Sequence, residues 1–456
     1  MADLRAIFKA YDVRGLVPSQ LDEQVARDIG AAFCAEVVED TDHPAVVVGH
    51  DMRESSPGLA AAFAEGVRDC GADVEMIGLA STDMLYFASG QLALPGAMFT
   101  ASHNPSSYNG IKMCRAGAVA LSEETGLGAI RSRAASHEPA RVGAGKRGAL
   151  NTRDLLASYG AYLRGLVPVE GRRLHVVVDA GNGMAGHTAP AVFGPLDLEV
   201  TPLYFELDGS FPNHEANPLD PANLVDLQRA VVRAGADVGL AFDGDADRCF
   251  VVDEHGDLVS PSALTALIAV RELAVEPGAH VIHNLITSKA VPEVIERHGG
   301  VPVRTRVGHS FIKATMASTN AIFGGEHSGH FYFRDFWYAD SGMLAALHVL
   351  ASLAATDVGV SRLVADYHPY VASGEVNVTV TDVARVVDEV SAAFESLDGV
   401  TFDHLDGLTV SAADWWFNVR PSNTEPVLRL NVEADTADTM AAVRDRVLSL
   451  MRTPNS

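Results

Sequence analysis

One order of segments occurs three times along this chain: a strand, a helix, a second strand, a spacer and a third strand. The copies begin at residues 45–49, 175–179 and 280–284. Each opening segment is largely apolar and rich in β-branched residues, which is typical of a strand buried inside a parallel sheet. Because parallel strands need crossover connections, usually helices, the repeat predicts three related α/β domains in tandem with right-handed crossovers.

The other segments of the three copies keep this order. In the first copy, the helix has apolar residues at intervals of four, at Leu59, Phe63 and Val67. The second strands are expected at 73–78, 198–203 and 301–305, and the third strands are expected to end near residues 99, 242 and 323.

After the third copy the pattern changes. Residues 375–380 and 427–432 alternate between apolar and polar side chains, as half-exposed strands do. A final helix carries apolar residues on one face, at Met440, Val443, Val447 and Leu450. The short segment 372–374 is either a hinge before this region or an ordinary tight turn.

The predicted fold class is therefore α/β: three tandem related α/β domains with mixed, mainly parallel sheets, followed by a smaller C-terminal α+β domain. The 456 residues are enough for two to four domains. The expected boundaries are 1–148, 149–253, 254–368 and 369–456.

The composition excludes several classes of partner. A formal net charge of −25 argues against nucleic acid and anionic membranes, but local arginines and lysines still permit a phosphorylated substrate. The four cysteines show no spacing typical of zinc ligands, which indicates free thiols. No apolar run is long enough to span a bilayer, so we expect a cytoplasmic protein, either a monomer or a homodimer.

In each of the three copies, a different group of polar residues follows the third strand. The first copy continues with Ser102 and His103, the second with the stretch 243–248, and the third with the stretch 324–330. Functional sites in open α/β sheets gather outside the carboxyl ends of the strands. Equivalent strand ends that carry complementary groups therefore predict one composite active site between the domains.

The second group has the character of a cation site. Asp243, Asp245 and Asp247 alternate with small residues, so their side chains can point the same way. Carboxylate ligands without histidine or cysteine suit Mg²⁺. An EF-hand is the rival, but its spaced glutamate and flanking helices are missing; a solvated acidic turn is the other alternative.

The first group gives the cation a partner. Asn104-Pro105 bends the chain directly after Ser102, which exposes a hydroxyl at a strand end, although a serine there could equally cap a turn. A phosphorylated serine would complete the ligands of a cation held by the three aspartates. Arg248 would then stabilise the phosphoryl group through charge-assisted hydrogen bonds.

The remaining polar motifs suggest sugar and phosphate binding. Glu326 and Ser328 could face the hydroxyls of a sugar together, with the imidazole of His309 upstream. Arg420 opens a loop rich in hydroxyl, amide and backbone donors, which is typical of an anion-binding nest. Arg14 precedes an expected glycine turn at Gly15 and could hold an anion, or simply lie on the surface.

Four of these motifs, at residues 100–105, 243–248, 325–329 and 420–424, resemble the signatures of the α-D-phosphohexomutase superfamily. They occur in the family's order and span essentially the whole chain. The resemblance implies four domains around a central cleft and an enzyme that works through a phosphoserine, with Mg²⁺ as cofactor and a hexose 1,6-bisphosphate as activator.

The resemblance also implies roles for individual residues. Ser102 would carry the phosphoryl group and, with the three aspartates, bind the metal, while Arg248 would contact the phosphoryl group. Proton transfer would fall to His103, Lys112 or His330, without a choice between acid and base. Substrate binding would involve Tyr11, Arg14, His309, Glu326, Ser328, Arg420, Ser422, Asn423 and Thr424.

Asn423 and the stretches 329–333 and 338–342 are most similar to the phosphomannomutase branch, which implies interconversion of mannose 6-phosphate and mannose 1-phosphate. A phosphoglucomutase or phosphoglucosamine mutase of the same superfamily is the alternative. Lys289 is offset from the lysine of dual-specificity members, which argues against tolerance of glucose phosphates. Two other classes would fit the motifs: a sugar-phosphate hydrolase, in which water accepts the phosphoryl group, and a sugar-phosphate sensor without activity.

Overall fold

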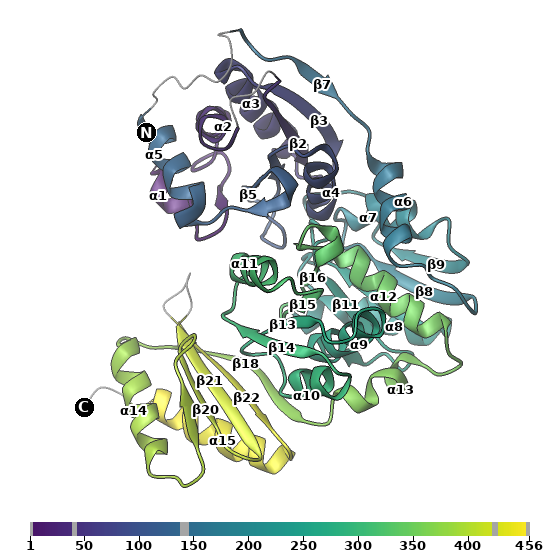
Figure 1. Ribbon diagram of the computed structural model, residues 1–456, viewed down its shortest axis with the longest axis vertical. Helices are drawn as coiled ribbons and strands as arrows, with labels where there is room; N and C mark the ends of the chain where they lie inside the picture. The colour runs from purple at the N-terminus through teal and green to yellow at the C-terminus, as the bar shows by residue number, and fades with distance from the viewer. Residues whose placement is uncertain (1–2, 39–42, 137–145, 422–426, 453–456) are drawn as a thin grey trace.

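The computed structural model describes residues 3–38, 43–136, 146–421 and 427–452. Its strands form four sheets, which follow one another along the chain from the purple N-terminal domain to the yellow C-terminal domain in Figure 1. The number and order of the sheets agree with the predicted fold class, three α/β domains followed by a smaller C-terminal domain. Among the described residues, no helix combines the length and the apolar character that crossing a membrane requires.

Domain I is built on a sheet in the order β1-β5-β4-β2-β3-β7, with β6 paired to β5. Strands β4, β2, β3 and β7 run parallel, whereas β1, β5 and β6 pair antiparallel. Its elements are α1 (Leu4–Ile7), β1 (Val13–Leu16), α2 (Glu23–Val37), β2 (Ala45–His50), α3 (Ser56–Cys70), β3 (Asp73–Leu79), α4 (Thr82–Leu92), β4 (Gly96–Phe99), β5 (Tyr108–Arg115), β6 (Val119–Ala120), α5 (Gly128–Ser136) and β7 (Leu150–Thr152).

Domain II has the sheet order β12-β11-β10-β8-β9, in which β10, β8 and β9 are parallel. Its elements are α6 (Leu156–Leu166), β8 (Leu174–Asp179), α7 (Ala185–Phe193), β9 (Leu198–Leu203), α8 (Val225–Ala234), β10 (Val238–Phe242), β11 (Cys249–Val252) and β12 (Leu258–Val259).

Domain III repeats the plan with the order β14-β13-β15-β16-β17, in which β14, β13 and β15 are parallel. Its elements are α9 (Pro261–Val275), β13 (His280–Asn284), α10 (Ala290–Arg297), β14 (Val301–Thr305), α11 (His309–Thr319), β15 (Phe323–Gly325), β16 (Phe331–Phe333), β17 (Ala339–Asp340), α12 (Gly342–Ala354) and α13 (Val360–Val364).

Domain IV differs, as the alternating pattern predicts: its sheet, in the order β18-β22-β21-β20-β19, is entirely antiparallel. Its elements are β18 (Val371–Thr379), α14 (Val383–Glu395), β19 (Thr401–Asp403), β20 (Leu408–Ser411), β21 (Trp415–Pro421), β22 (Val427–Ala434) and α15 (Ala437–Met451).

Domains I to III share one apolar core, although domain I also has a core of its own, whereas the buried apolar residues described in domain IV form a separate cluster. The largest apolar cluster runs without a break from Met98 through Val178 to Phe331, which belong to domains I, II and III in turn. A separate cluster fills the space between the sheet and the helices of domain IV. Domain IV is tied to domain III by polar contacts, which include the pairs Lys289–Asp435 (2.7 Å) and Arg304–Asp403. The first three domains therefore form the more rigid frame for a shared site.

Two expectations about glycine-containing segments were wrong. Gly15 lies inside β1, opposite Asn109, and not in a turn; a Cβ there would come within 2.7 Å of the side chain of Ile7, so close packing explains the glycine. The segment 372–374 lies inside β18 and not between domains. Its pairing with β22 shifts register between Ala372 and Glu375, and Gly374 has a φ of 68°, so the small residues form a bulge.

Candidate active site

Ser102 lies in the turn after β4, at the carboxyl end of a buried parallel strand. Its φ is 50°, and the residue is only 5% exposed. The amide of Ser102 donates to Thr100 Oγ1 at 3.0 Å, which stabilises this left-handed turn. The hydroxyl donates to Asp243 Oδ2 at 2.7 Å, across 141 residues of sequence. The structure therefore brings the first and second predicted groups into direct contact.

The three aspartates of the second group lie between β10 and β11 and are almost completely buried. One oxygen from each of them lies within 4.8 Å of the others. Asp245 Oδ1 and Asp247 Oδ1 are buried without a hydrogen-bond partner, which is costly unless another positive group binds there. Hard oxygen donors with free lone pairs at this spacing fit Mg²⁺.

Arg248 connects the aspartates to the serine. Its guanidinium is 2% exposed, and Nε donates to Asp243 Oδ2 at 2.9 Å. Its Nη2 lies 3.4 Å from Ser102 Oγ and donates to His103 Nδ1 at 2.5 Å. Burial and the charge of Arg248 hold the pKa of His103 well below its ordinary value. The neutral imidazole thus accepts from Arg248 and orients the guanidinium towards Ser102.

Lys112, on β5, is the second cation of the site. Its ammonium donates to Asp245 Oδ2 at 2.7 Å and to Asp247 Oδ2 at 2.5 Å. Burial alone would lower the pKa of Lys112, but these two carboxylates outweigh it, so the pKa is raised. At the same carboxyl group, Thr82 Oγ1 donates to Asp245 Oδ2 at 2.6 Å. Domain I therefore contributes Lys112 and Thr82, in addition to Ser102, as donors to the aspartate loop of domain II.

The ionisation of the aspartates reflects these neighbours. Burial raises the pKa of Asp243 to about 7. The charge of Arg248 opposes this rise, and the charges of Asp247 and Asp245 add to it. For Asp245, burial is opposed by the charge and hydrogen bond of Lys112, which hold the pKa below its ordinary value. Three carboxylates thus face two fixed cations, and a divalent cation would relieve their remaining repulsion.

The third-domain loop reaches the same site through His330. His330 Nε2 lies 3.6 Å from Asp247 Oδ1, and His330 Nδ1 lies 2.9 Å from Ser328 Oγ. Glu326 is buried, and its carboxylate accepts from the hydroxyl of Tyr332 at 2.7 Å and from the amide of Gly308 at 3.3 Å. Glu326 is therefore fixed in place by its own domain, while His330 and Ser328 are half-buried.

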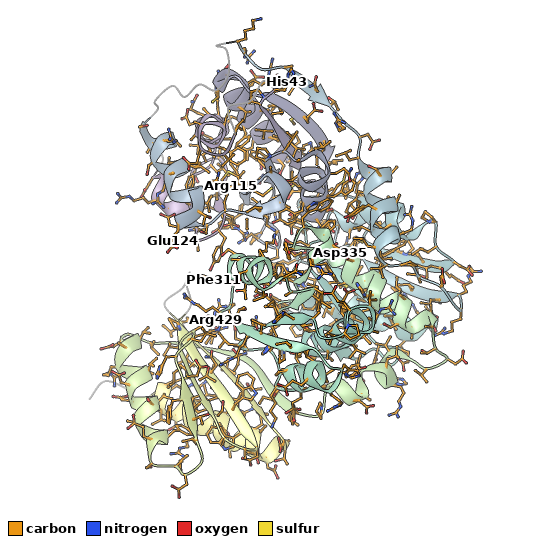
Figure 2. The ribbon with its side chains drawn as sticks, in the orientation of Figure 1. His43, Arg115, Glu124, Phe311, Asp335 and Arg429 are labelled. Atoms are coloured by element: carbon orange, nitrogen blue, oxygen red, sulfur yellow. The ribbon has the colours of Figure 1, made fainter. Side chains whose placement is uncertain are left out.

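Tyr11 lies at the boundary between domains I and III, and Arg14 lies beside the serine loop of domain I. The ring of Tyr11 meets Phe311 of α11, labelled in Figure 2, edge-on with centroids 6.1 Å apart. Arg14 donates to Asn104 Oδ1 in the serine loop and pairs with Asp12 at 2.6 Å. His309 begins α11, but its side chain lies outside the described part of the structure.

Arg420 lies near the end of β21 and is 7% exposed. It pairs with Glu375 at 2.8 Å, and Arg429, labelled in Figure 2, lies 3.4 Å from the same carboxylate. Burial and the charge of Arg420 lower the pKa of His327, which places domain IV beside the third-domain loop. Two guanidinium groups against one carboxylate leave positive charge for an anion. Ser422, Asn423 and Thr424 lie outside the described residues.

Sequence reasoning missed three residues of this site: Thr82, Asp51 and Arg53. Asp51 and Arg53 follow β2, the strand parallel and adjacent to β4, and both are almost completely buried. The rule that located Ser102, a polar group at the carboxyl end of a buried strand, would have found them if applied to the first strand of the copy as well. Nothing in the sequence around Thr82 marks it.

The site combines a serine of the first α/β domain, aspartates of the second and an arginine of the fourth domain. This arrangement is the architecture of the α-D-phosphohexomutases. The chain belongs to the phosphoglucomutase/phosphomannomutase family. Models of the family's alpha/beta/alpha domains I, II and III match residues 5–141, 158–256 and 260–370, and the model of its C-terminal domain matches residues 375–450.

Individual relatives agree with this assignment. The chain is 39% identical to a phosphomannomutase of Escherichia coli K12 over 449 residues, which covers 97% of both chains. It is 41% identical to a protein of Xanthomonas campestris described as phosphohexose mutases, with 93% of this chain and 94% of the relative covered. Among solved structures, a phosphoglucomutase/phosphomannomutase family protein of Burkholderia thailandensis superposes with a TM-score of 0.91 at 34% identity, covering 100% of this chain and 99% of the other.

Proposed function

We propose that this protein is a phosphomannomutase, which interconverts mannose 6-phosphate and mannose 1-phosphate through a phosphoserine at residue 102 and a hexose 1,6-bisphosphate intermediate. The observation that carries the mechanism is the contact of Ser102 Oγ with Asp243 at 2.7 Å and with Arg248 at 3.4 Å. Relatives named phosphomannomutase, 39% and 40% identical over nearly the whole chain, support the choice of substrate.

In the proposed reaction, the free hydroxyl of the sugar phosphate attacks the phosphoryl group on Ser102. The bond from phosphorus to Ser102 Oγ breaks, and the proton lost by the sugar hydroxyl ends on that oxygen. Arg248 holds the phosphoryl oxygens through the Nη2 that His103 orients. We assign the movement of the proton to Lys112 and His330, which lie against the two carboxylate oxygens of Asp247.

The metal site fits the same scheme. The carboxylates of Asp243, Asp245 and Asp247, with the Ser102 phosphate, would hold Mg²⁺, which when bound withdraws charge from the phosphoryl group. The two unpartnered oxygens of Asp245 and Asp247 support this assignment.

Recognition of the sugar falls to the outer parts of the site. We assign Glu326 and Ser328 to the sugar hydroxyls, with Tyr11, Arg14 and His309 beside them, and Arg420 with Ser422, Asn423 and Thr424 to the phosphate that does not react. The bisphosphate must turn over between the two transfers, so this one anchor binds either end of the sugar in turn. Two arginines around Glu375 support a phosphate site there.

The proposal is tested with the full-length protein, Mg²⁺ and a trace of hexose 1,6-bisphosphate. We expect kcat/KM to be highest for mannose 1-phosphate in a panel with glucose and glucosamine 1-phosphates. Ser102→Ala should lose turnover by orders of magnitude, whereas Ser106→Ala, an exposed serine of the same loop, should keep it. Normal turnover by Ser102→Ala would remove the mechanism, and release of inorganic phosphate as fast as isomerisation would indicate a hydrolase.

A further inference from the structure

Arg53 lies beneath the loop that carries Ser102, and it is only 2% exposed. Its Nη2 donates to the carbonyl oxygens of Ser102 (2.9 Å) and Asn104 (2.7 Å). Its Nη1 donates to those of Pro105 (2.9 Å) and Tyr108 (3.0 Å). One guanidinium therefore binds four backbone carbonyls of a single loop.

The position of Arg53 is itself fixed from both sides. The carboxylate of Asp51 lies 3.3 Å from Arg53 Nε, and Asp51 in turn accepts from Ser56 Oγ at 2.5 Å. The ring of Phe211, which belongs to domain II, lies over the guanidinium at 5.1 Å. Arg53 thus contacts a buried carboxylate of its own domain and an aromatic ring of the next domain.

The carbonyl that Arg53 binds at Ser102 also packs against the aspartate loop. A Cβ built on Gly244 would lie 2.3 Å from Ser102 O, so the backbones of the two loops are in contact at this point. Ser102 has a positive φ of 50°, a conformation that costs a non-glycine residue energy and that its surroundings must hold. The direction of Ser102 Oγ towards Asp243 depends on that backbone.

From these contacts we infer that Arg53 is a positioning residue for the nucleophile: its planar fork holds the loop 102–108 so that Ser102 Oγ faces the aspartates and Arg248. This inference rests on the proposed role of Ser102. Arg53 does not bind the substrate; it acts through the backbone of the loop. A lysine would keep the charge but cannot reproduce two nitrogens that each bind two carbonyls in one plane.

The test compares Arg53→Lys and Arg53→Met with the control Arg68→Lys. Arg68 belongs to α3 of the same domain, and its Nε donates to the carbonyl of Gly148 at 3.0 Å, before β7 and away from the serine loop. For each variant we would measure the thermal midpoint, kcat and KM for mannose 1-phosphate, and the rate at which a hexose 1,6-bisphosphate phosphorylates Ser102, followed by intact mass spectrometry.

Both Arg53 variants should lose about 100-fold in kcat and in the rate of Ser102 phosphorylation, the usual effect of misplacing a reacting group by about 1 Å, with KM changed by less than about threefold. Arg68→Lys should keep wild-type values of both rates. A purely structural role would lower the thermal midpoint of the Arg53 variants and leave kcat of the folded protein unchanged, and Arg53→Lys with wild-type kcat would overturn the inference.

Two further variants keep the test decisive. If the Arg53 variants do not fold, Asp51→Asn keeps Arg53 but removes the ion pair that fixes its guanidinium. The four carbonyl contacts should then loosen and kcat should fall at constant KM, and unchanged kcat would overturn the inference. Ser102→Ala separates the two hypotheses: if it is active, the proposed mechanism fails, whereas if it is inactive and the Arg53 variants behave as wild type, only the positioning role fails.

Discussion

The hydrogen bond from Thr82 to Asp245 should matter more to this protein than other buried threonine hydrogen bonds. Thr82 is the first residue of α4 and is fully buried, and its hydroxyl donates to Asp245 Oδ2 at 2.6 Å. Thr82→Val keeps the shape and removes the donor. Hydrogen bonds to charged groups contribute about 1.5–3 kcal/mol. Because Lys112 still pairs with the same oxygen at 2.7 Å, we expect a loss near the middle of that range, about 2 kcal/mol.

Thr188→Val is the matched control. Thr188 is also fully buried, and its hydroxyl donates to the backbone carbonyl of Met184 at 3.1 Å, which is a neutral acceptor. A neutral hydrogen bond contributes about 0.5–1.5 kcal/mol, so this variant should lose about half as much. Urea titrations followed by circular dichroism give the free energy of unfolding of both variants relative to the wild type.

The metal supplies the second readout. Thr82 orients a carboxylate assigned to Mg²⁺, and the loss of such an outer contact typically weakens metal binding by about 10- to 100-fold. Calorimetric titration with Mg²⁺ should therefore show a higher Kd for Thr82→Val and an unchanged Kd for Thr188→Val. Equal destabilisation of the two variants, together with equal Kd values, would refute this account of the aspartate loop.

Three other predictions follow from buried contacts. Burial raises the pKa of Asp83 to about 7 despite hydroxyl donors from Ser341, Ser81 and Tyr159, so the folded state binds a proton that the unfolded state releases near pH 4. The stabilisation from this proton is therefore complete below pH 4 and is lost as the pH rises towards 7. From pH 5 to 8, the unfolding free energy of the wild type should fall by on the order of 2–3 kcal/mol relative to that of Asp83→Asn. Parallel pH profiles of unfolding free energy for the two proteins would contradict this. Gly90→Ala should lower the thermal midpoint although alanine favours helices, because its Cβ would come within 2.2 Å of the Trp337 ring; overpacking costs about 1–3 kcal/mol against a gain of about 1. Removing divalent cations with EDTA should abolish turnover reversibly. It should shift the thermal midpoint little, because Lys112 already pairs with Asp245 and Asp247. Unfolding of the protein by EDTA would contradict the expected small shift in the thermal midpoint.

The order of strands and helices was predictable because it depends on local patterns. The strands that open the three copies in domains I to III are short and rich in β-branched residues, and the strands of domain IV alternate, so these segments carry their own signal. The register within the sheets carries no such signal. Gly15 therefore looked like a turn residue, and the bulge at 372–374 looked like a hinge or a turn, because small residues serve all of these roles.

The candidate site was predictable to the extent that it lies at strand ends. Ser102, the aspartate triplet and Arg248 each follow a strong apolar strand, and the structure brings them together as expected. Arg53 follows a buried strand and could have been named as a candidate, but its role, like that of Thr82, comes from partners far along the chain. Thr82 and Asp245 are 163 residues apart, and Arg53 and Ser102 are 49 apart. Such pairs are defined by how the domains pack.

By itself, the sequence determined the tandem α/β plan, the chemistry at each strand end and the family, because hydrophobic periodicity and short motifs are properties of neighbouring residues. Only the tertiary structure decided which cations neutralise the aspartates, which side chain holds the serine loop and where the domains share a core. The physical reason is that a hydrogen bond or an ion pair needs two groups within about 3 Å, and packing alone brings distant segments that close.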